Sequence, residues 1–259
     1  MGIVNVTPDS FYSAARTQTT DQAIARGRDL LEMGCDIVDV GGESTRPGAE
    51  DVPVVEELAR VLPVVQALSS WGRVSVDTRK ALVAREAVSA GARVLNDVSG
   101  SLVEVAGELG VGYVAMHSRG TPRTMQIDPH YDDVVRDVAT ALEVLAVRAR
   151  DAGVTDLWLD PGIGFGKTVE HNLALVAHCG EFVSLAARHG AGVLMGTSRK
   201  GFLGRMGTED LDVGERLEGS IATAAWSLLS GVAMIRVHDV AAALQLRDLF
   251  ARPLAEVAP

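Results

Sequence analysis

Short apolar runs alternate with longer amphipathic stretches from one end of the chain to the other. The short runs are rich in Val, Ile and Leu and suit buried β-strands, whereas the longer stretches repeat their apolar residues with a helical period. We predict strands at residues 2–6, 36–40, 73–77, 93–97, 113–117, 155–160, 192–196 and 233–237. We predict helices at about 21–33, 53–69, 79–90, 103–109, 132–152, 169–188, 215–230 and 240–251. Each predicted strand is therefore followed by a helix.

This alternation is typical of a parallel sheet, because a parallel neighbour is reached only through a crossover, which is usually a helix. Eight such units in 259 residues predict a closed (β/α)8 barrel, with residues 1–259 as one domain. An open doubly wound sheet is the rival architecture. It would usually show a glycine-rich dinucleotide turn after the first strand, and Asn5-Val6-Thr7-Pro8 is not such a turn.

Composition and charge narrow the classes of partner. The chain is 47% hydrophobic with a formal net charge of −10, so it lacks the basic surface that nucleic acids and anionic membranes require. We find no apolar run long enough to span a bilayer. Its two cysteines, Cys35 and Cys179, lie far apart without a zinc-ligand spacing, which predicts a cytoplasmic, disulfide-free protein.

Polar side chains stand at the carboxyl ends of most predicted strands, and these ends share one face of a barrel. They are Asn5, Asp39, Asp77, Asn96, His117, Asp160, Lys200, Arg236 and His238. Such a set suits a flat polar ligand with many hydrogen-bonding groups, because desolvated charges need partners. For Asp39 we favour a purely structural role. Arg236 and His238 point the same way on a strand, and together with Arg46 and Asn5 they could bind an anion.

Several segments resemble the dihydropteroate synthases, the enzymes of folate synthesis that sulfonamides target. The matching segments, which follow one another in order along the chain, are residues 5–11, 41–48, 76–78, 96–100, 116–117, 160–165, 196–200 and 236–240. Among them are Asn5-Val6-Thr7-Pro8-Asp9-Ser10-Phe11, Gly41-Gly42-Glu43-Ser44-Thr45-Arg46-Pro47-Gly48 and Asp160-Pro161-Gly162-Ile163-Gly164-Phe165.

The resemblance implies condensation of 6-hydroxymethyl-7,8-dihydropterin pyrophosphate with p-aminobenzoate, assisted by Mg²⁺, in a homodimer. It places the pterin ring against Asp77, Asn96, Met116, Asp160, Lys200 and Arg236. It places the diphosphate against Arg236, His238, Arg46 and Asn5, with Asn5 also contacting the metal. It assigns the p-aminobenzoate slot to Phe11, Thr45, Pro47 and Phe165. The later helices would form the dimer, with Leu217, Ile221, Trp226 and Leu228 as contributors.

The chain departs from this family near p-aminobenzoate. Ser13-Ala14-Ala15 replaces an acid and two glycines of the first loop, and Gly201 replaces a frequent serine. These changes leave open a paralogue that binds pterin diphosphate but uses p-aminobenzoate poorly, accepts another amine or tolerates sulfonamides. A pterin-binding methyltransferase domain and a non-catalytic pterin-binding homologue also stay open. The methyltransferase has no need for the segments around Arg46 and Lys200, and the non-catalytic homologue would be expected to lose anion-site residues.

Overall fold

The computed structural model describes residues 1–7, 20–46, 48–120 and 123–250, so Phe11, Ser13-Ala14-Ala15 and Pro47 lie outside the described residues. Its strands are β1 Gly2–Asn5, β2 Ile37–Gly41, β3 Arg73–Asp77, β4 Val94–Asp97, β5 Gly112–Met116, β6 Leu157–Asp160, β7 Gly192–Met195 and β8 Met234–Ile235. They form a sheet in the order β1 to β8, and every neighbouring pair is parallel. The predicted parallel α/β architecture is therefore confirmed.

Backbone contacts also bring the segment after β8 beside β1. Gly2 and Val237 form an isolated parallel bridge. The Ile3 N–H donates to the Val237 carbonyl oxygen at 3.0 Å, and the Val237 N–H donates to the Met1 carbonyl oxygen at 3.0 Å. Residues at the two ends of the strand order are thus neighbours in space.

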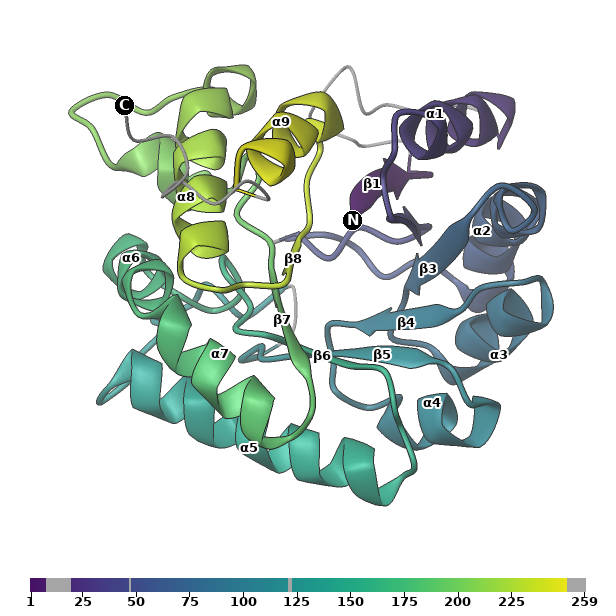
Figure 1. Ribbon diagram of the computed structural model, residues 1–259, viewed down its shortest axis with the longest axis horizontal. Helices are drawn as coiled ribbons and strands as arrows, with labels where there is room; N and C mark the ends of the chain where they lie inside the picture. Colours follow the sequence, from purple (N-terminus) through teal and green to yellow (C-terminus); the bar gives the residue numbers. More distant parts are fainter. Residues whose placement is uncertain (8–19, 47, 121–122, 251–259) are drawn as a thin grey trace, which may run out of the picture.

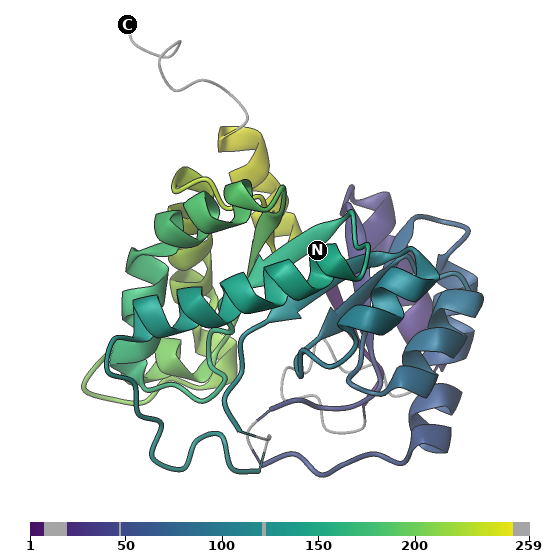
Figure 2. The ribbon, with the colours of Figure 1, turned by 90° about the horizontal axis from the view of Figure 1, so that it is seen from below.

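Helices surround the curled sheet (Figure 1). They are α1 Thr20–Glu32, α2 Val54–Leu68, α3 Ala81–Ser89, α4 Val103–Leu109, α5 Val134–Asp151, α6 Val169–Ala177, α7 Cys179–Arg188, α8 Leu217–Leu229 and α9 Val240–Phe250, with 3₁₀ turns η2 Gly201–Arg205 and η3 Val213–Glu215. Figure 2 shows the long helix α5 running across the outside of the strands.

The single helix that we predicted at 169–188 is wrong, because the structure divides it into α6 and α7. The break lies at His178, whose φ of −104° and ψ of 21° depart from helical values. Its ring Nδ1 lies 2.9 Å from the Ala174 carbonyl oxygen. Gly180, a poor helix former, lies two residues after this break, in the first turn of α7.

The strands alternate between two environments, as a sheet covered on both faces requires. Outward side chains such as Val38 and Val40 pack in a large cluster with the helices. Inward side chains such as Ile37 and Val114 form a smaller cluster inside the curled sheet. Because the period is two, the inward series continues from Ile37 to Asp39, and polar residues replace apolar ones toward the carboxyl ends.

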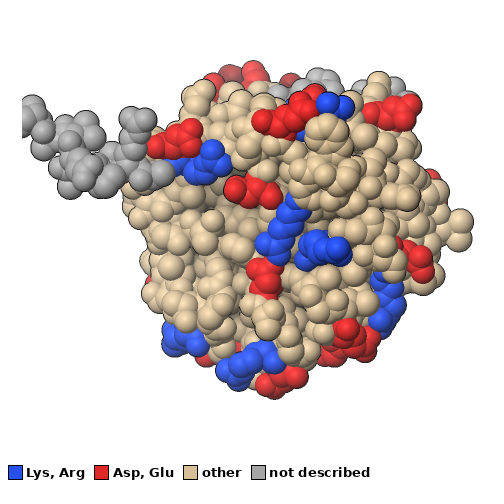
Figure 3. All heavy atoms as spheres, turned by 45° about the vertical axis from the view of Figure 1, so that its right-hand side comes forward, with Lys and Arg blue, Asp and Glu red and all other residues tan. Residues whose placement is uncertain are grey.

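Charged residues of both signs lie on the surface (Figure 3). On the face drawn in Figure 3, Lys and Arg lie interspersed with Asp and Glu. Over the residues that the structure describes, no helix combines the length and apolar character needed to cross a membrane. Cys35 and Cys179 are both buried free thiols, as expected.

Candidate functional site

Arg236 forms the centre of a polar cluster at the carboxyl ends of the strands. Its Nε donates to Asp39 Oδ2 at 2.7 Å, and its Nη2 donates to Asp77 Oδ2 at 2.9 Å. Asn96 Nδ2 donates to the same Asp39 oxygen at 2.9 Å. Residues of β2, β3 and β4 therefore meet the residue that follows β8. We predicted a purely structural role for Asp39, and the structure places it in contact with both Arg236 and Asn96.

Burial dominates the electrostatics of the cluster. Burial raises the pKa of Asp77 to about 7, although Arg236 opposes the shift. Burial also acts to lower the pKa of Arg236, but the neighbouring carboxylates of Asp39 and Asp77 outweigh it, and the Arg236 pKa is raised. Asp39 Oδ1 and Ser75 Oγ are buried without a hydrogen-bond partner among the described residues. The cluster thus holds a fixed cation against two carboxylates in a largely dry environment.

Asp160 ends β6, and the glycine-rich loop after it holds its carboxylate. The Gly162 N–H donates to Asp160 Oδ1 at 2.7 Å. Gly162, Gly164 and Gly166 have φ angles of 69°, 83° and 64°, which favour glycine. A Cβ on Gly162 would lie only 1.8 Å from the His117 carbonyl oxygen. Burial raises the pKa of Asp160, whereas the Gly162 N–H and the nearby lysines lower it.

Lys167 supports this loop from within, a role that sequence analysis missed. It is only 3% exposed, and its Nζ lies 2.9 Å from the Gly162 oxygen, 3.0 Å from the Phe165 oxygen and 3.0 Å from His117 Nδ1. Burial lowers the Lys167 pKa to about 7. When Lys167 is protonated it can only donate, so His117 Nδ1 then accepts and the His117 proton resides on Nε2. The available signal was a lysine directly after Gly166 in a loop made by glycines.

Lys200 and Phe165, both predicted site residues, are brought together by the same loop. Lys200 Nζ donates to the Ile163 carbonyl oxygen at 2.9 Å and lies 4.1 Å from the centroid of the Phe165 ring. Burial lowers the Lys200 pKa to about 8, while Asp160 and Asp77 act in the opposite direction. The lysine is thus a donor held between a backbone carbonyl and an aromatic face.

The loop after β7 is anchored to the loop after β8. Arg199, with a φ of 54°, forms a bidentate pair with Asp239 at 2.8 and 2.9 Å. Ser198 Oγ accepts from the His238 N–H at 3.1 Å and lies 3.0 Å from His238 Nδ1. These contacts connect the position of Lys200 with that of His238.

The charges of Arg236 and Arg46 act on the pKa of His238, and the charge of Arg236 acts on the pKa of Arg46. Burial lowers the pKa of His238 to about 3, with Arg236 and Arg46 adding to the shift. Burial and then Arg236 lower the pKa of Arg46. Asn5 ends β1, and a Cβ on Gly41 of the neighbouring strand would lie 3.7 Å from Asn5 Oδ1. Arg46, Arg236 and His238 are therefore close enough for their charges to act on one another.

The loop after β2, which carries Thr45 and Arg46, is held by an ionic network. Glu43 accepts from the Val52 N–H at 2.8 Å and from Arg79 Nε at 3.1 Å, and Lys80 Nζ lies 3.0 Å from it. Lys80 Nζ also donates to the fully buried Glu57. Met116, the last predicted pocket residue, is buried at the end of β5 and pairs in register with Asp160.

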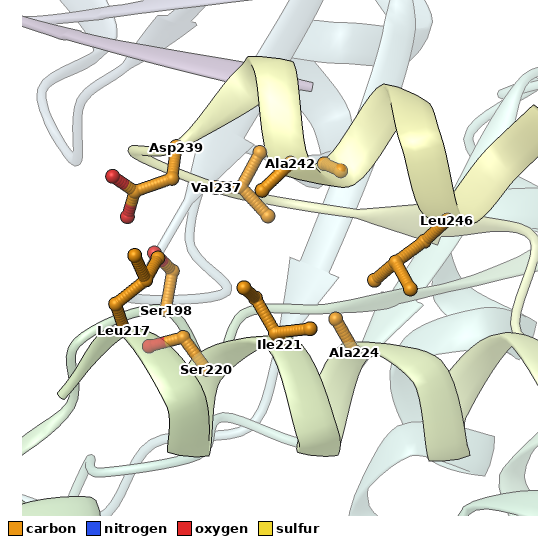
Figure 4. Close-up of a pocket in the computed structure, with 10 residues that line it drawn as sticks. Ser198, Leu217, Ser220, Ile221, Ala224, Val237, Asp239, Ala242 and Leu246 are labelled. Carbon is orange, nitrogen blue, oxygen red and sulfur yellow. The ribbon is translucent and has the colours of Figure 1, made fainter.

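Two cavities lie away from this cluster. One, of about 10 Å³, lies between α8 and α9 and is also lined by Ser198 and Asp239 (Figure 4). It has room for about one water. The other, of about 410 Å³, is lined by residues from the opposite ends of the strands, including Ile37, Arg73 and Met234. No predicted substrate-binding residue lines either cavity.

Known proteins resemble this chain over most of its length. Residues 1–238 match the model of the family described as pterin binding enzyme. The dihydropteroate synthase of Escherichia coli K12 is 42% identical over 252 residues, covering 93% of this chain and 86% of that protein. The Xanthomonas albilineans dihydropteroate synthase structure with 4-aminobenzoic acid has a TM-score of 0.86 at 40% identity, covering 100% of this chain and 93% of that one. The Thermus thermophilus dihydropteroate synthase structure with 6HMPPP has a TM-score of 0.81 at 41% identity, covering 98% of this chain and 93% of that one.

Proposed function

The chain belongs to the dihydropteroate synthase family of pterin-binding enzymes, and we propose that it performs the reaction after which that family is named. It would join 6-hydroxymethyl-7,8-dihydropterin pyrophosphate to p-aminobenzoate, giving 7,8-dihydropteroate and pyrophosphate. The observation that carries the proposal is the convergence of two carboxylates and one amide, from β2, β3 and β4, around Arg236. We also propose that the sheet closes between β8 and β1, so that residues 1–259 form one (β/α)8 barrel. The Gly2–Val237 bridge supports this closure.

The donors and acceptors of the cluster suit a reduced pterin. Its pyrimidine edge offers adjacent N–H donors, and Asp160, oriented by the Gly162 N–H, is an acceptor for them. Lys200 would donate to the opposite edge of the ring. Asp77 and Asn96 would contact the remaining nitrogens, with Met116 packed beside the ring. A ligand with these groups would satisfy side chains that burial otherwise destabilises in their charged forms.

The diphosphate would lie against Arg236, Arg46 and His238. Two guanidiniums supply fixed charge, and His238, neutral at pH 7 because burial lowers its pKa to about 3, supplies a hydrogen bond instead. Among the described residues, no group of three or more His, Cys, Asp and Glu could hold a metal ion. The residues present fit a Mg²⁺ that is bound by the substrate's diphosphate and by a single protein oxygen, the Asn5 side-chain amide. When bound, it would neutralise charge that develops on the leaving diphosphate.

The reaction needs little proton chemistry from the protein. The C–O bond between the pterin methylene and the diphosphate breaks with its electrons going to the diphosphate, and the amine nitrogen forms the new C–N bond before losing a proton to water. We propose an SN1-like order, in which the pterin spreads the positive charge while Arg236 and Arg46 stabilise the departing anion. The remaining task of the residues is to position the amine, which Phe165 and Thr45 would do together with Phe11 and Pro47.

Exposed apolar side chains on neighbouring helices support a homodimer. Trp226 and Leu229 of α8 are 51% and 60% exposed, and Leu173 of α6 is 40% exposed. Trp226 Nε1 donates to the Val176 carbonyl oxygen at 3.0 Å, which fixes the indole between the two helices. Ile221, a predicted contributor, lies on the same helix but faces the small cavity toward α9 (Figure 4). Light scattering at micromolar concentration should give the mass of two chains.

Pyrophosphate release tests the proposed function. With dihydropterin pyrophosphate and Mg²⁺, release should depend on p-aminobenzoate and should yield dihydropteroate. Arg236→Leu should lower turnover at least ~100-fold, because it removes a charge contact to the leaving group. Arg136→Leu, at an exposed position on α5, serves as the control. Pterin binding without p-aminobenzoate-dependent release would contradict the proposal and favour the paralogue with altered amine use.

A further inference from the structure

We did not predict Asp39 as a ligand contact, yet it accepts hydrogen bonds from two residues that we did predict, Arg236 and Asn96. We propose that Asp39 is a positioning residue, whose buried carboxylate sets the orientation in which Arg236 and Asn96 meet the pterin diphosphate. This inference rests on the proposed function, because it concerns how the same site is organised.

Asp39 lies too deep to contact substrate itself. It is fully buried, with 0% of its surface exposed. In the parallel register it is level with Ser75, whereas Gly41, two residues further along β2, is level with Asp77. Asp39 therefore lies one inward-facing level below the strand ends that carry the polar cluster. Any effect on the reaction must pass through its neighbours.

A single oxygen atom of Asp39 restricts the orientation of both Arg236 and Asn96. Asp39 Oδ2 accepts from Arg236 Nε at 2.7 Å and from Asn96 Nδ2 at 2.9 Å. Asp77 takes Nη2, on the same edge of the guanidinium, at 2.9 Å. The Nε and Nη2 edge of Arg236 is thereby occupied, which leaves the Nη1 end for a ligand. Because a carboxylate can only accept hydrogen bonds, the Asn96 side chain must direct its amide nitrogen toward Asp39.

The other oxygen of Asp39 makes its charge depend on the contacts of Oδ2. Asp39 Oδ1 is buried and has no hydrogen-bond partner among the described residues. The charge of the carboxylate is therefore compensated mainly through Oδ2, and removing that compensation would leave a buried charge unpaired. Arg236 cannot turn toward solvent without exposing Asp39 to that penalty. The ion pair keeps the guanidinium in place before substrate arrives.

Asp39→Asn tests the proposal, because it keeps the shape of the side chain and removes its charge. The variant should lower kcat/KM for dihydropterin pyrophosphate by roughly 10- to 100-fold, with the KM for p-aminobenzoate changed less than about 3-fold. Ser75→Ala is the matched control, since Ser75 lies beside Asp39 in register and its buried hydroxyl also has no hydrogen-bond partner in the part of the chain that the structure describes. It should stay within about 2-fold of the wild type.

A double-mutant cycle separates positioning from a general effect on the barrel. Asp39→Asn should lower kcat/KM by a certain factor in the wild type. In an Arg236→Lys background the corresponding factor should be less than a third as large, because the guanidinium that Asp39 orients is gone. Equal factors in both backgrounds, or an Asp39→Asn enzyme with the kcat/KM of the wild type, would overturn the inference. A wild-type protein without turnover would contradict the proposed function instead. If Asp39→Asn does not fold, Asp39→Ser takes its place under the same criteria.

Discussion

Replacing Lys167 with methionine should destabilise the protein and loosen its site at once. The substitution keeps an unbranched chain of similar length but removes the ammonium that contacts three acceptors. The carbonyl oxygens of Gly162 and Phe165 and the Nδ1 of His117 would then be left without their donor. Because Lys200 is bound to the Ile163 carbonyl of the same loop, its position should become less defined.

The expected loss of stability is the balance of two large terms. A hydrogen bond to a charged group contributes about 1.5–3 kcal/mol, so the three contacts of Lys167 together represent roughly 5–9 kcal/mol. Removing the ammonium also removes its desolvation penalty, which is several kcal/mol for a buried ion. We expect a net loss of about 2–4 kcal/mol. For a domain of this size that corresponds to a Tm lowered by roughly 5–15 °C.

The measurement is urea unfolding at about pH 6, below the Lys167 pKa of about 7, so that the wild-type lysine is protonated in the folded state. The control is Arg85→Met, which breaks an ion pair with Glu108 whose side chains are 43% and 59% exposed. That pair should contribute less than about 1 kcal/mol. Lys167→Met should also raise the KM for p-aminobenzoate about 10-fold, because Phe165 and Lys200 shift with the loop. If Lys167→Met and Arg85→Met were equally stable, the reasoning about the three acceptors would be refuted.

Two further predictions concern the same loop and its neighbour. Lys200 is an effective donor only when protonated, and its pKa is about 8, so kcat/KM should fall as the pH rises through about 8. In Lys200→Arg this decline should disappear or move upward by more than about one pH unit, because a guanidinium stays charged, and an unchanged pH profile would contradict the assignment. Gly162→Ala should cost at least about 3 kcal/mol in urea unfolding, since its Cβ would overlap the His117 carbonyl. Gly190→Ala, which has a similar φ of 62° but open space around the Cβ, should cost only about 1 kcal/mol.

The architecture was predictable because burial imposes a period on the sequence. All eight predicted strands are present in order, and their parallel pairing follows from the intervening helices. The division between α6 and α7 was missed because apolar residues continue with a helical spacing through His178 and Cys179. Periodicity shows which face of a helix is buried. Two successive helices that pack against the same sheet therefore give nearly the same pattern of apolar residues as one long helix.

Much of the predicted cluster also follows from one rule. Parallel strands end on the same face, so Asp77, Asn96 and Asp160 had to lie on one face of the sheet once the strands were placed. Arg236 joins them because it follows β8 directly. The rule places a residue at a level of the sheet, but it does not say which of several charges will pair.

That gap accounts for the two residues that sequence reasoning undervalued. Lys167 is held largely by backbone carbonyls, and every residue has one, so no spacing of side chains could reveal its partners. Asp39 is held by side chains, but they lie 57 and 197 positions away and share a single oxygen. A buried carboxylate on an inward strand position must nevertheless be compensated, and Arg236, which follows β8, is the cation that contacts it. Counting charges on each inward-facing level, rather than reading strand ends one at a time, would have placed Asp39 in the site from the sequence.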